Sequence, residues 1–284
     1  MKTAETMQEL FTAIEDDLLD QVVQMTNEFP APPSILNRIL ELTNDPTTQV
    51  EQVAEVLATE PAVAAKVLKQ SNSAFYGRSR RISSVHDAVV MLGFHTIRSL
   101  VVATAAHSLY FRCQETSELR HKMWEHSLAT AIACRLLAQT LKNVNPEVAY
   151  IAGLLHDAGK LVLLERWPEH FIRVVERQKD DSIASLELEL EQFGFTHALV
   201  GAVLIDRWLF PQPLVAAVAL HHEVDHLHEL PGLVHYANRY VSSLGYNLHT
   251  YSREAWQSIS EEPLIQRDHF ETVLSEQKAL FESA

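Results

Sequence analysis

The chain has 284 residues, of which 47% are hydrophobic and 21% charged, so it can fold around one large core or two moderate ones. Lysine and arginine total 23 against 37 acidic residues, and the net charge of -14 repels a nucleic-acid backbone. Duplex nucleic acid is therefore excluded as an expected partner. Charged residues or histidine interrupt each apolar run before the roughly 18 residues of a membrane span, and the first residues lack an apolar signal region. These features predict a cytoplasmic protein that does not enter the membrane.

Apolar residues recur at intervals of three and four rather than two, which predicts an all-α chain. Prolines at the start of two segments, Pro33 and Pro61, can begin a helix but cannot lie inside one. The first part of the chain therefore predicts short helices joined by tight turns, over 34–43, from Thr48 or Gln49, over 62–70 and over 85–92.

From about residue 119 the predicted helices become longer and richer in alanine and leucine. They are expected over 119–141, 146–165, 168–179, 182–193, 196–208, 212–222 and 231–244, and a last one over 264–281. The change in composition predicts three parts, namely an N-terminal helical subdomain over 1–112, a helical bundle over 113–245 and a C-terminal extension over 246–284.

An adjacent imidazole and carboxylate, His156 and Asp157, follow an apolar helix and precede Gly159. Two neighbouring side chains cannot both point along one face of a helix, so a turn at the aspartate is needed to direct them to one ion. Gly159 suits such a turn. A second pair of the same kind, His86 and Asp87, lies in an ordinary amphipathic segment and is interpreted as structural.

Further histidines lie on other predicted helices, in a chain that holds 15 in all. Thr196 is expected to cap a helix and to place His197 in its first turn. Imidazole and carboxylate groups from several helices are a usual way to hold one or two ions of Mn, Fe, Zn or Mg, although each histidine taken singly is more often structural. The candidate ligands beside His156 and Asp157 are His126, His197, His221 and His222.

These motifs resemble those of a known family. The stretches 124–127 and 154–160 are similar to the two opening motifs of the HD superfamily of metal-dependent phosphohydrolases. The upstream half resembles the HDOD family more specifically, and the resemblance covers roughly residues 20–245. It rests on residues 29–33, Glu60-Pro61, residues 67–76 with Asn72-Ser73-Ala74, and residues 88–93 with Leu92-Gly93.

The resemblance implies an HD-type helical bundle behind an N-terminal helical subdomain, in a bacterial protein that accompanies signalling and gene regulation. HDOD proteins are generally regarded as degenerate HD domains without demonstrated hydrolysis. Set against the related HD-GYP phosphodiesterases, Lys160 matches the lysine that contacts substrate phosphate and, with Asp157, forms the expected catalytic pair. The metal ligands implied by the same comparison are His126, His156, Asp157, His197, His221 and His222.

One position departs from that pattern, because the last ligand, an aspartate in the family, falls on Asn238. An amide is a weaker, neutral oxygen donor, so metal can bind while hydrolysis fails. Asp225 could supply the missing carboxylate or be a solvated loop acid. The expected cofactor is a divalent metal, potentially dinuclear, with Fe, Mn or Zn ahead of Mg.

The motifs are compatible with two main functions. In the first, the chain is a signalling or regulatory protein with a degenerate, metal-binding HD site, and its partners are signalling proteins or a nucleotide-type small molecule. In the second, it is a metal-dependent phosphohydrolase that acts on a nucleotide or a cyclic dinucleotide. A structural helical protein with coincidental histidines is the third interpretation. Whether the chain is an enzyme, and its oligomeric state, are left open by the sequence.

Overall fold

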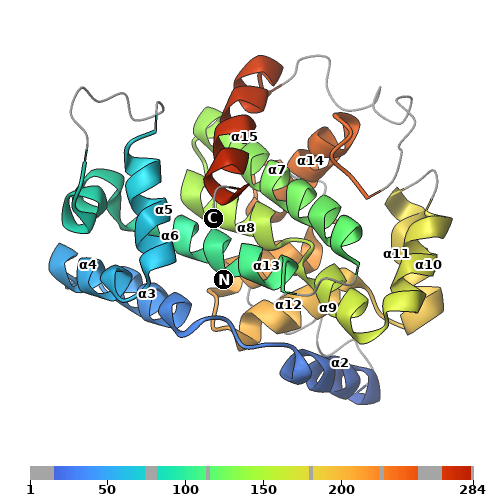
Figure 1. Ribbon diagram of the computed structural model, residues 1–284. Helices are drawn as coiled ribbons and strands as arrows, with labels where there is room; N and C mark the ends of the chain where they lie inside the picture. The colour runs from blue at the N-terminus through green and yellow to red at the C-terminus, as the bar shows by residue number, and fades with distance from the viewer. Residues whose placement is uncertain are drawn as a thin grey trace. The chain divides into compact units, whose positions relative to one another are not determined.

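The computed structural model describes residues 16–73, 82–112, 116–178, 182–223, 227–248 and 264–282. Every regular element in these ranges is an α-helix, which confirms the predicted all-α class (Figure 1). The contacts divide the chain into two compact units. We call residues 1–31 and 113–266 the long unit, and residues 32–112 and 267–284 the short unit.

In the short unit, three short helices pack on one long helix. Pro61 begins one of them at its first position, and the Gln49 and Gln52 side chains form a reciprocal cap at the start of another. The long helix begins where the Ser84 hydroxyl accepts a hydrogen bond from the Asp87 amide at 3.0 Å. The bounds are α3 Ser34–Asn44, α4 Val50–Ala58, α5 Pro61–Ser71 and α6 Val85–Tyr110.

The element α6 is kinked at Gly93, where the backbone is non-helical (φ 75°). Its first part therefore ends at the bound predicted for the helix 85–92, and a second part, which the sequence did not predict, continues to Tyr110. Among the described residues α6 is long and apolar enough to cross a membrane by length and composition, but 61% of its most apolar stretch is buried inside the protein. A second candidate requires joining Leu186–Phe193 to His197–Arg207, which meet at a bend of 78°. Buried core helices can have the same length and apolar composition as membrane spans, so these two candidates are weak evidence for a span.

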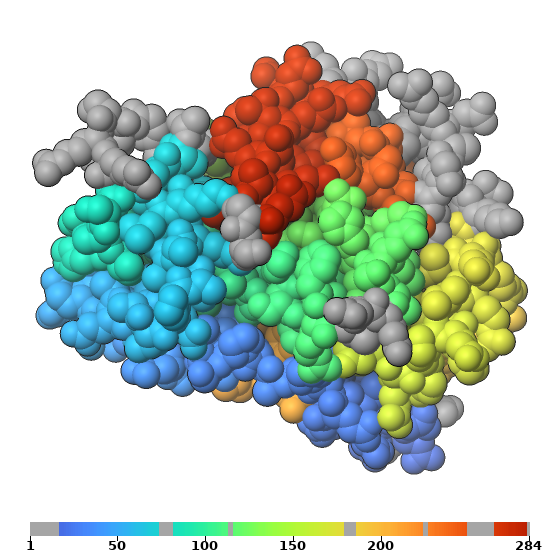
Figure 2. Space-filling view, in the orientation of Figure 1, coloured from blue at the N-terminus to red at the C-terminus, as the bar shows by residue number. Residues whose placement is uncertain are grey.

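The last helix, α15 (Arg267–Glu282), belongs to the short unit, where it packs on α5. The Lys66 ammonium lies 5.0 Å from the centre of the Phe281 ring, and Gln277 Nε2 donates to Gln70 Oε1 at 3.1 Å. Figure 2 shows the side chains of α15, in red, beside those of α5, in cyan. The contacts thus group the last helix with the N-terminal helices, which the sequence had placed apart from it.

In the long unit, six helices surround a common centre. Small residues allow them to approach closely: a Cβ added to Gly153 would lie 2.7 Å from Cys134 Sγ and 2.9 Å from the Ala131 backbone. These helices are α7 Ser117–Leu141, α8 Pro146–Leu155, α9 Ala158–Arg166, α12 His197–Arg207, α13 Gln212–Leu220 and α14 Leu230–Ser243. Helix α7 packs on α8 and α14, and α9 packs on α12.

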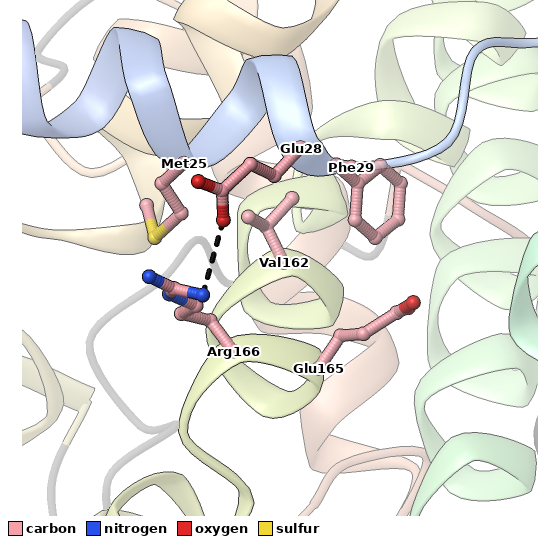
Figure 3. Close-up of a pocket in the computed structure, with 6 residues that line it drawn as sticks. All are labelled: Met25, Glu28, Phe29, Val162, Glu165 and Arg166. Carbon is pink, nitrogen blue, oxygen red and sulfur yellow. Dashed lines mark ion pairs between the residues drawn. The ribbon is translucent and has the colours of Figure 1, made fainter.

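Three further helices complete the long unit, namely α2 Asp16–Glu28, α10 Pro168–Arg177 and α11 Ser182–Phe193. Where α2 packs on α9, a pocket of about 140 Å³ lies between them (Figure 3). Met25 and Phe29 line it on one side and Val162 on the other, and Arg166 pairs with Glu28 across it at 3.0 Å. This pocket contains none of the candidate metal ligands.

Candidate metal centre

The helix predicted over 146–165 is interrupted by the His-Asp pair. His156 ends α8, and Asp157, with φ -100° and ψ 11°, precedes α9. This break turns both side chains to one place, so that His156 Nε2 lies 3.4 Å from Asp157 Oδ2. The turn at the aspartate that the sequence required is therefore present, one helix is replaced by two, and the ring and the carboxylate converge.

Gly159 has a different role from the one expected, because it lies inside α9 and not in the turn. A Cβ at this position would lie 2.0 Å from the His197 carbonyl oxygen and 2.6 Å from the Gly201 nitrogen. The glycine therefore allows α9 to lie directly against the first turn of α12. The close contact brings His197 to Asp157.

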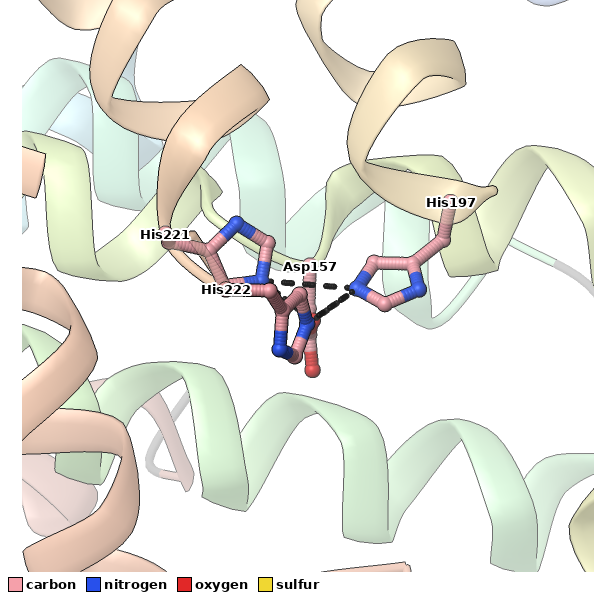
Figure 4. A group of neighbouring side chains, drawn as sticks. All are labelled: Asp157, His197, His221 and His222. Atoms are coloured by element: carbon pink, nitrogen blue, oxygen red, sulfur yellow. Dashed lines mark hydrogen bonds and ion pairs between the residues drawn. The ribbon is translucent and has the colours of Figure 1, made fainter. Parts of the chain in front are cut away.

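The remaining candidate histidines come from three other helices. His126 lies on α7, and His221 follows the last residue of α13, with His222 next to it. The Thr196 hydroxyl accepts a hydrogen bond from the Leu199 amide, which confirms the expected cap, and His197 is the first residue of α12. Figure 4 shows His197, His221 and His222 arranged around Asp157.

The Asp157 carboxylate lies between two groups of imidazoles. Its Oδ2 atom is 3.5 Å from His126 Nε2 and 3.4 Å from His156 Nε2. Its Oδ1 atom is 3.2 Å from His197 Nε2 and 3.7 Å from His221 Nε2. We call these the His126 site (His126, His156 and Asp157) and the His197 site (Asp157, His197, His221 and His222), and within each the possible ligand atoms lie within 4.8 Å of one another.

The outer nitrogens of these rings are held by acceptors. Nδ1 of His126 lies 2.6 Å from the Tyr246 carbonyl oxygen, and the same atom of His156 lies 2.7 Å from that of Gly153. His221 Nδ1 is 2.7 Å from the Val218 carbonyl oxygen. A carbonyl only accepts, so Nδ1 carries the proton and Nε2 presents a lone pair to the centre. This tautomer is the one that binds metal through Nε2.

The ring of His197 is held by a buried carboxylate instead of a carbonyl group. Glu189 of α11 accepts from the His197 amide at 2.7 Å and lies 2.7 Å from His197 Nδ1. The sequence pattern gave no indication that Glu189 takes part in the centre. The segment from Leu186 to Glu191 alternates leucine and glutamate, so nothing local distinguishes the one fully buried acid from Glu187 and Glu191.

Burial sets the charge of most of the rings. It lowers the pKa of four imidazoles, most strongly at His156 and His222, so neutral rings are favoured at His126, His156, His221 and His222. At His197 burial also acts downward, but the Glu189 and Asp157 carboxylates together outweigh it and raise the pKa. Burial would raise the pKa of Asp157, but His156 and Lys160 outweigh it and hold that pKa well below its usual range.

The buried atoms of the centre fit a metal ion. His156 Nε2 and Asp157 Oδ1 are buried and have no hydrogen-bond partner. His222 Nε2 lies 3.1 Å from His197 Nε2, and His197 Nε2 lies 3.4 Å from His221 Nε2. His197 and His221 have an acceptor at Nδ1, so with the proton there their Nε2 lone pairs face one another and repel, and a cation between them removes the repulsion. The His222 ring can donate to His197 from Nε2 or turn a lone pair to the same cation. Nitrogen and carboxylate donors of this kind suit Zn, Fe and Mn better than Mg.

The other predicted site residues lie at the edge of the centre. Lys160 Nζ contacts Asp157 Oδ2 at 2.7 Å. Asn238 of α14 is half-buried and lies beside His126, where its side chain acts to raise the His126 pKa against burial. Asp225 lies outside the described residues. The pair His86 and Asp87 is exposed on the short unit, where His86 Nε2 lies 3.3 Å from Glu51 Oε1, as its structural interpretation expects.

An all-helical chain with a buried histidine and aspartate centre at a helix break has the architecture of HD-type proteins, and comparison with known proteins defines it further. The HDOD domain model matches residues 29–224, which is more than half of the chain. The chain belongs to the HDOD family, as the motifs predicted.

Two solved structures share this fold. An HDOD domain protein of unknown function from Geobacter sulfurreducens is 25% identical, with a TM-score of 0.68 over 92% of this chain and 90% of that one. A candidate phosphohydrolase from Shewanella amazonensis SB2B is 24% identical, with a TM-score of 0.66 over 92% and 88% of the two chains. An uncharacterised protein from Treponema pallidum (strain Nichols) is 27% identical over 213 residues, 75% of this chain. The chain spans 41% of the length of that relative.

Proposed function

We propose that the chain is a bacterial regulatory protein whose long unit binds divalent metal, Fe, Mn or Zn, and through it a phosphate-bearing small molecule of the nucleotide type. One observation carries the proposal: both oxygens of the buried Asp157 carboxylate face Nε2 atoms of histidines whose Nδ1 atoms are already engaged. Preoriented lone pairs around a shared carboxylate bind cations without reorganisation.

The residues of the centre have separate tasks in this proposal. The His126 and His197 sites would each hold an ion, and Asp157 would bridge them. Bound metal supplies Lewis-acid polarisation of a phosphoryl group. Lys160 provides a mobile positive charge next to Asp157, suited to contact a phosphoryl oxygen. The net charge of -14 favours a small anion bound at this buried centre over a nucleic-acid polymer.

A regulatory role rather than turnover is supported by Asn238. An amide beside His126 replaces the carboxylate expected there and leaves the centre with Asp157 as its one carboxylate among the described ligand candidates. Weaker charge compensation lowers the capacity to activate a nucleophile more than it lowers the capacity to bind. We propose cytoplasmic signalling proteins as the partners that respond to the bound state.

Phosphohydrolysis is the second candidate, and the placement of Lys160 favours it. Its ammonium lies 2.7 Å from Asp157 and its side chain is 14% exposed, so it can reach a substrate at the edge of the centre. In that case the chain would hydrolyse a nucleotide or a cyclic dinucleotide, and Asp157 and Lys160 would be the catalytic pair.

Elemental analysis of the purified protein tests the metal centre. We expect near-stoichiometric Fe, Mn or Zn in the wild type and its loss in Asp157→Ala, because that variant removes the ligand shared by both sites. Asp87→Ala is the matched control, since it changes an exposed aspartate that also follows a histidine and should leave the metal content unchanged.

Background metal in the wild type, or equal loss in both variants, contradicts the proposal. The metal-loaded protein is then assayed with a chromogenic phosphodiester. Turnover that disappears in Lys160→Gln but persists in Asp87→Ala would establish the hydrolase; metal binding without turnover is the regulatory outcome.

A further inference from the structure

The negative charge around the centre is too small to balance two divalent ions. Two carboxylates, Asp157 and Glu189, face one ammonium, Lys160, and every imidazole that binds an ion through the Nε2 lone pair is neutral. This arrangement carries a net charge of about one negative unit. One divalent ion converts it to about one positive unit, and two ions convert it to about three, which is costly where the ligands are buried.

The two sites are also unequal. The His197 site has three imidazoles, and the carboxylate of Glu189 stands behind one of them. The His126 site has two imidazoles, and its carboxylate oxygen, Asp157 Oδ2, is the atom that Lys160 contacts at 2.7 Å. An ion at the His126 site would therefore bind an oxygen that already contacts the Lys160 ammonium, which repels the ion. An ion at the His197 site binds the other oxygen, Asp157 Oδ1.

We infer that the His197 site holds a resident ion and that the His126 site fills only together with a phosphate-type anion. The anion supplies the missing negative charge and gives Lys160 a new partner, which frees Asp157 Oδ2 for the second ion. The inference rests on the proposed function, because it requires the centre to bind metal. It adds that metal and ligand occupy the His126 site together.

The exposed side of the centre is suited to admit such an anion. His156, His197 and His221 are fully buried, whereas Lys160, His222 and Asn238 are half-buried. The ammonium and the amide, which can both donate hydrogen bonds to a phosphoryl oxygen, thus lie on the accessible side. The ligand class is an orthophosphate ion or the terminal phosphate of a nucleotide.

Coupled binding makes the centre a sensor of this anion. If the anion raises the affinity of the second ion, the second ion raises the affinity of the anion by the same factor. The number of bound ions then reports the ligand without any bond being broken. This behaviour agrees with a regulatory protein and does not require hydrolysis.

The test is a manganese titration of the full-length protein in phosphate-free buffer, followed by electron paramagnetic resonance. We expect about one tightly bound ion per chain without added anion, and about two, with the spectrum of a coupled pair, after addition of inorganic phosphate. Phosphate should strengthen the second binding step at least about 10-fold. Parallel titrations with adenosine monophosphate identify the source of the anion, since a larger effect than that of inorganic phosphate indicates a nucleotide.

Two variants test the charge argument from opposite directions. Lys160→Gln removes the opposing positive charge, and Asn238→Asp adds a carboxylate beside His126, so either should allow the second ion to bind without phosphate. If one variant does not fold, the other retains the test. Lys122→Gln is the control, because Lys122 is exposed and pairs with Glu118 on the surface of α7.

Two ions bound to the wild type without phosphate, or one ion at every phosphate concentration, would overturn the inference and leave the proposed function standing. No bound ion under any condition would overturn both.

Discussion

At the residue scale, Glu189 sets the position of His197, a candidate metal ligand. Its carboxylate is fully buried and engages both the ring and the backbone of His197. A carboxylate that accepts from a ligand ring fixes the tautomer and makes the coordinating nitrogen more basic. The residue is thus a positioning residue for the His197 site, although it does not face the ion itself.

We predict that Glu189→Gln weakens metal binding by about 10- to 100-fold, because a neutral amide replaces the acceptor of the His197 proton. Competition with a calibrated chelator measures the change. Glu191→Gln on the same helix is the control, since Glu191 is exposed and pairs with Arg177. Unchanged affinity in a folded Glu189→Gln protein would argue against the role.

The ionised state of Asp157 is a second feature at the residue scale. Its pKa is held below its usual range by His156 and Lys160 against the effect of burial, so it stays ionised at neutral pH. The ionised carboxylate can share its two oxygens between the two histidine groups. A neutral amide at this position would offer only one oxygen, which is why Asp157 is the residue whose loss should affect both sites.

At the scale of elements, the end of α12 contains a strained residue. Leu209 has a left-handed backbone conformation, φ 61°, and its side chain is 78% exposed. The amides of Leu209 and Phe210 bond back to the carbonyl oxygens of Asp206 and Ile205. This is the helix ending at which glycine is usual, because a Cβ is disfavoured there.

Leu209→Gly should therefore raise the free energy of unfolding by about 0.5 to 1 kcal/mol, since relief of the left-handed conformation exceeds the added entropy of the unfolded chain. Thermal unfolding measures the change. Leu190→Gly provides a contrast of opposite sign: Leu190 is also exposed but lies within α11, where glycine costs about 1 kcal/mol. A lower Tm in both variants would show that the Leu209 side chain contributes to stability.

The close packing of α9 on α12 is a second feature at the scale of elements. Gly159 permits it, since any side chain would collide with the His197 carbonyl group. The helix break before α9 and the cap before α12 then place Asp157 and His197 opposite each other. The centre depends on this pair of helix ends more than on the length of any helix.

At the scale of the whole molecule, the candidate metal ligands and the last helix belong to different units. The described candidate ligands all belong to the long unit, whereas the last helix belongs to the short unit. That helix lies beyond the residues matched by the HDOD domain model, and it buries Phe270, Leu274 and Phe281. It therefore contributes to the core of the short unit without taking part in the metal centre.

We predict that a chain ending at residue 263 loses at least about 3 kcal/mol of stability in the short unit, because two buried phenylalanines and a buried leucine are removed. Its metal content should remain that of the full chain. Hydrogen exchange at the amides of α5 measures the loss, and elemental analysis measures the retention. Ser275→Ala, on the exposed face of the same helix, is the control and should change neither. Loss of metal on truncation would contradict this division.

The sequence by itself determined the all-α class, the start of most helices and the family, although it did not predict α2 and joined α8 and α9 into one helix. The spacing of apolar residues, the prolines at helix starts and the Thr196 cap are local features, and local features fix where helices begin. The pair His156 and Asp157 and the histidines on other predicted helices indicated a metal site, and resemblance to the family added Lys160 and Asn238.

Only the tertiary structure decided how these residues meet. The division of the Asp157 oxygens between two groups, the burial of Glu189 among alternating glutamates and the real task of Gly159 all depend on which helices contact each other. The grouping of the last helix with α5 depends on the same contacts. Periodicity tells which face of a helix is apolar, but not which distant segment covers it, because that choice is made by long-range packing.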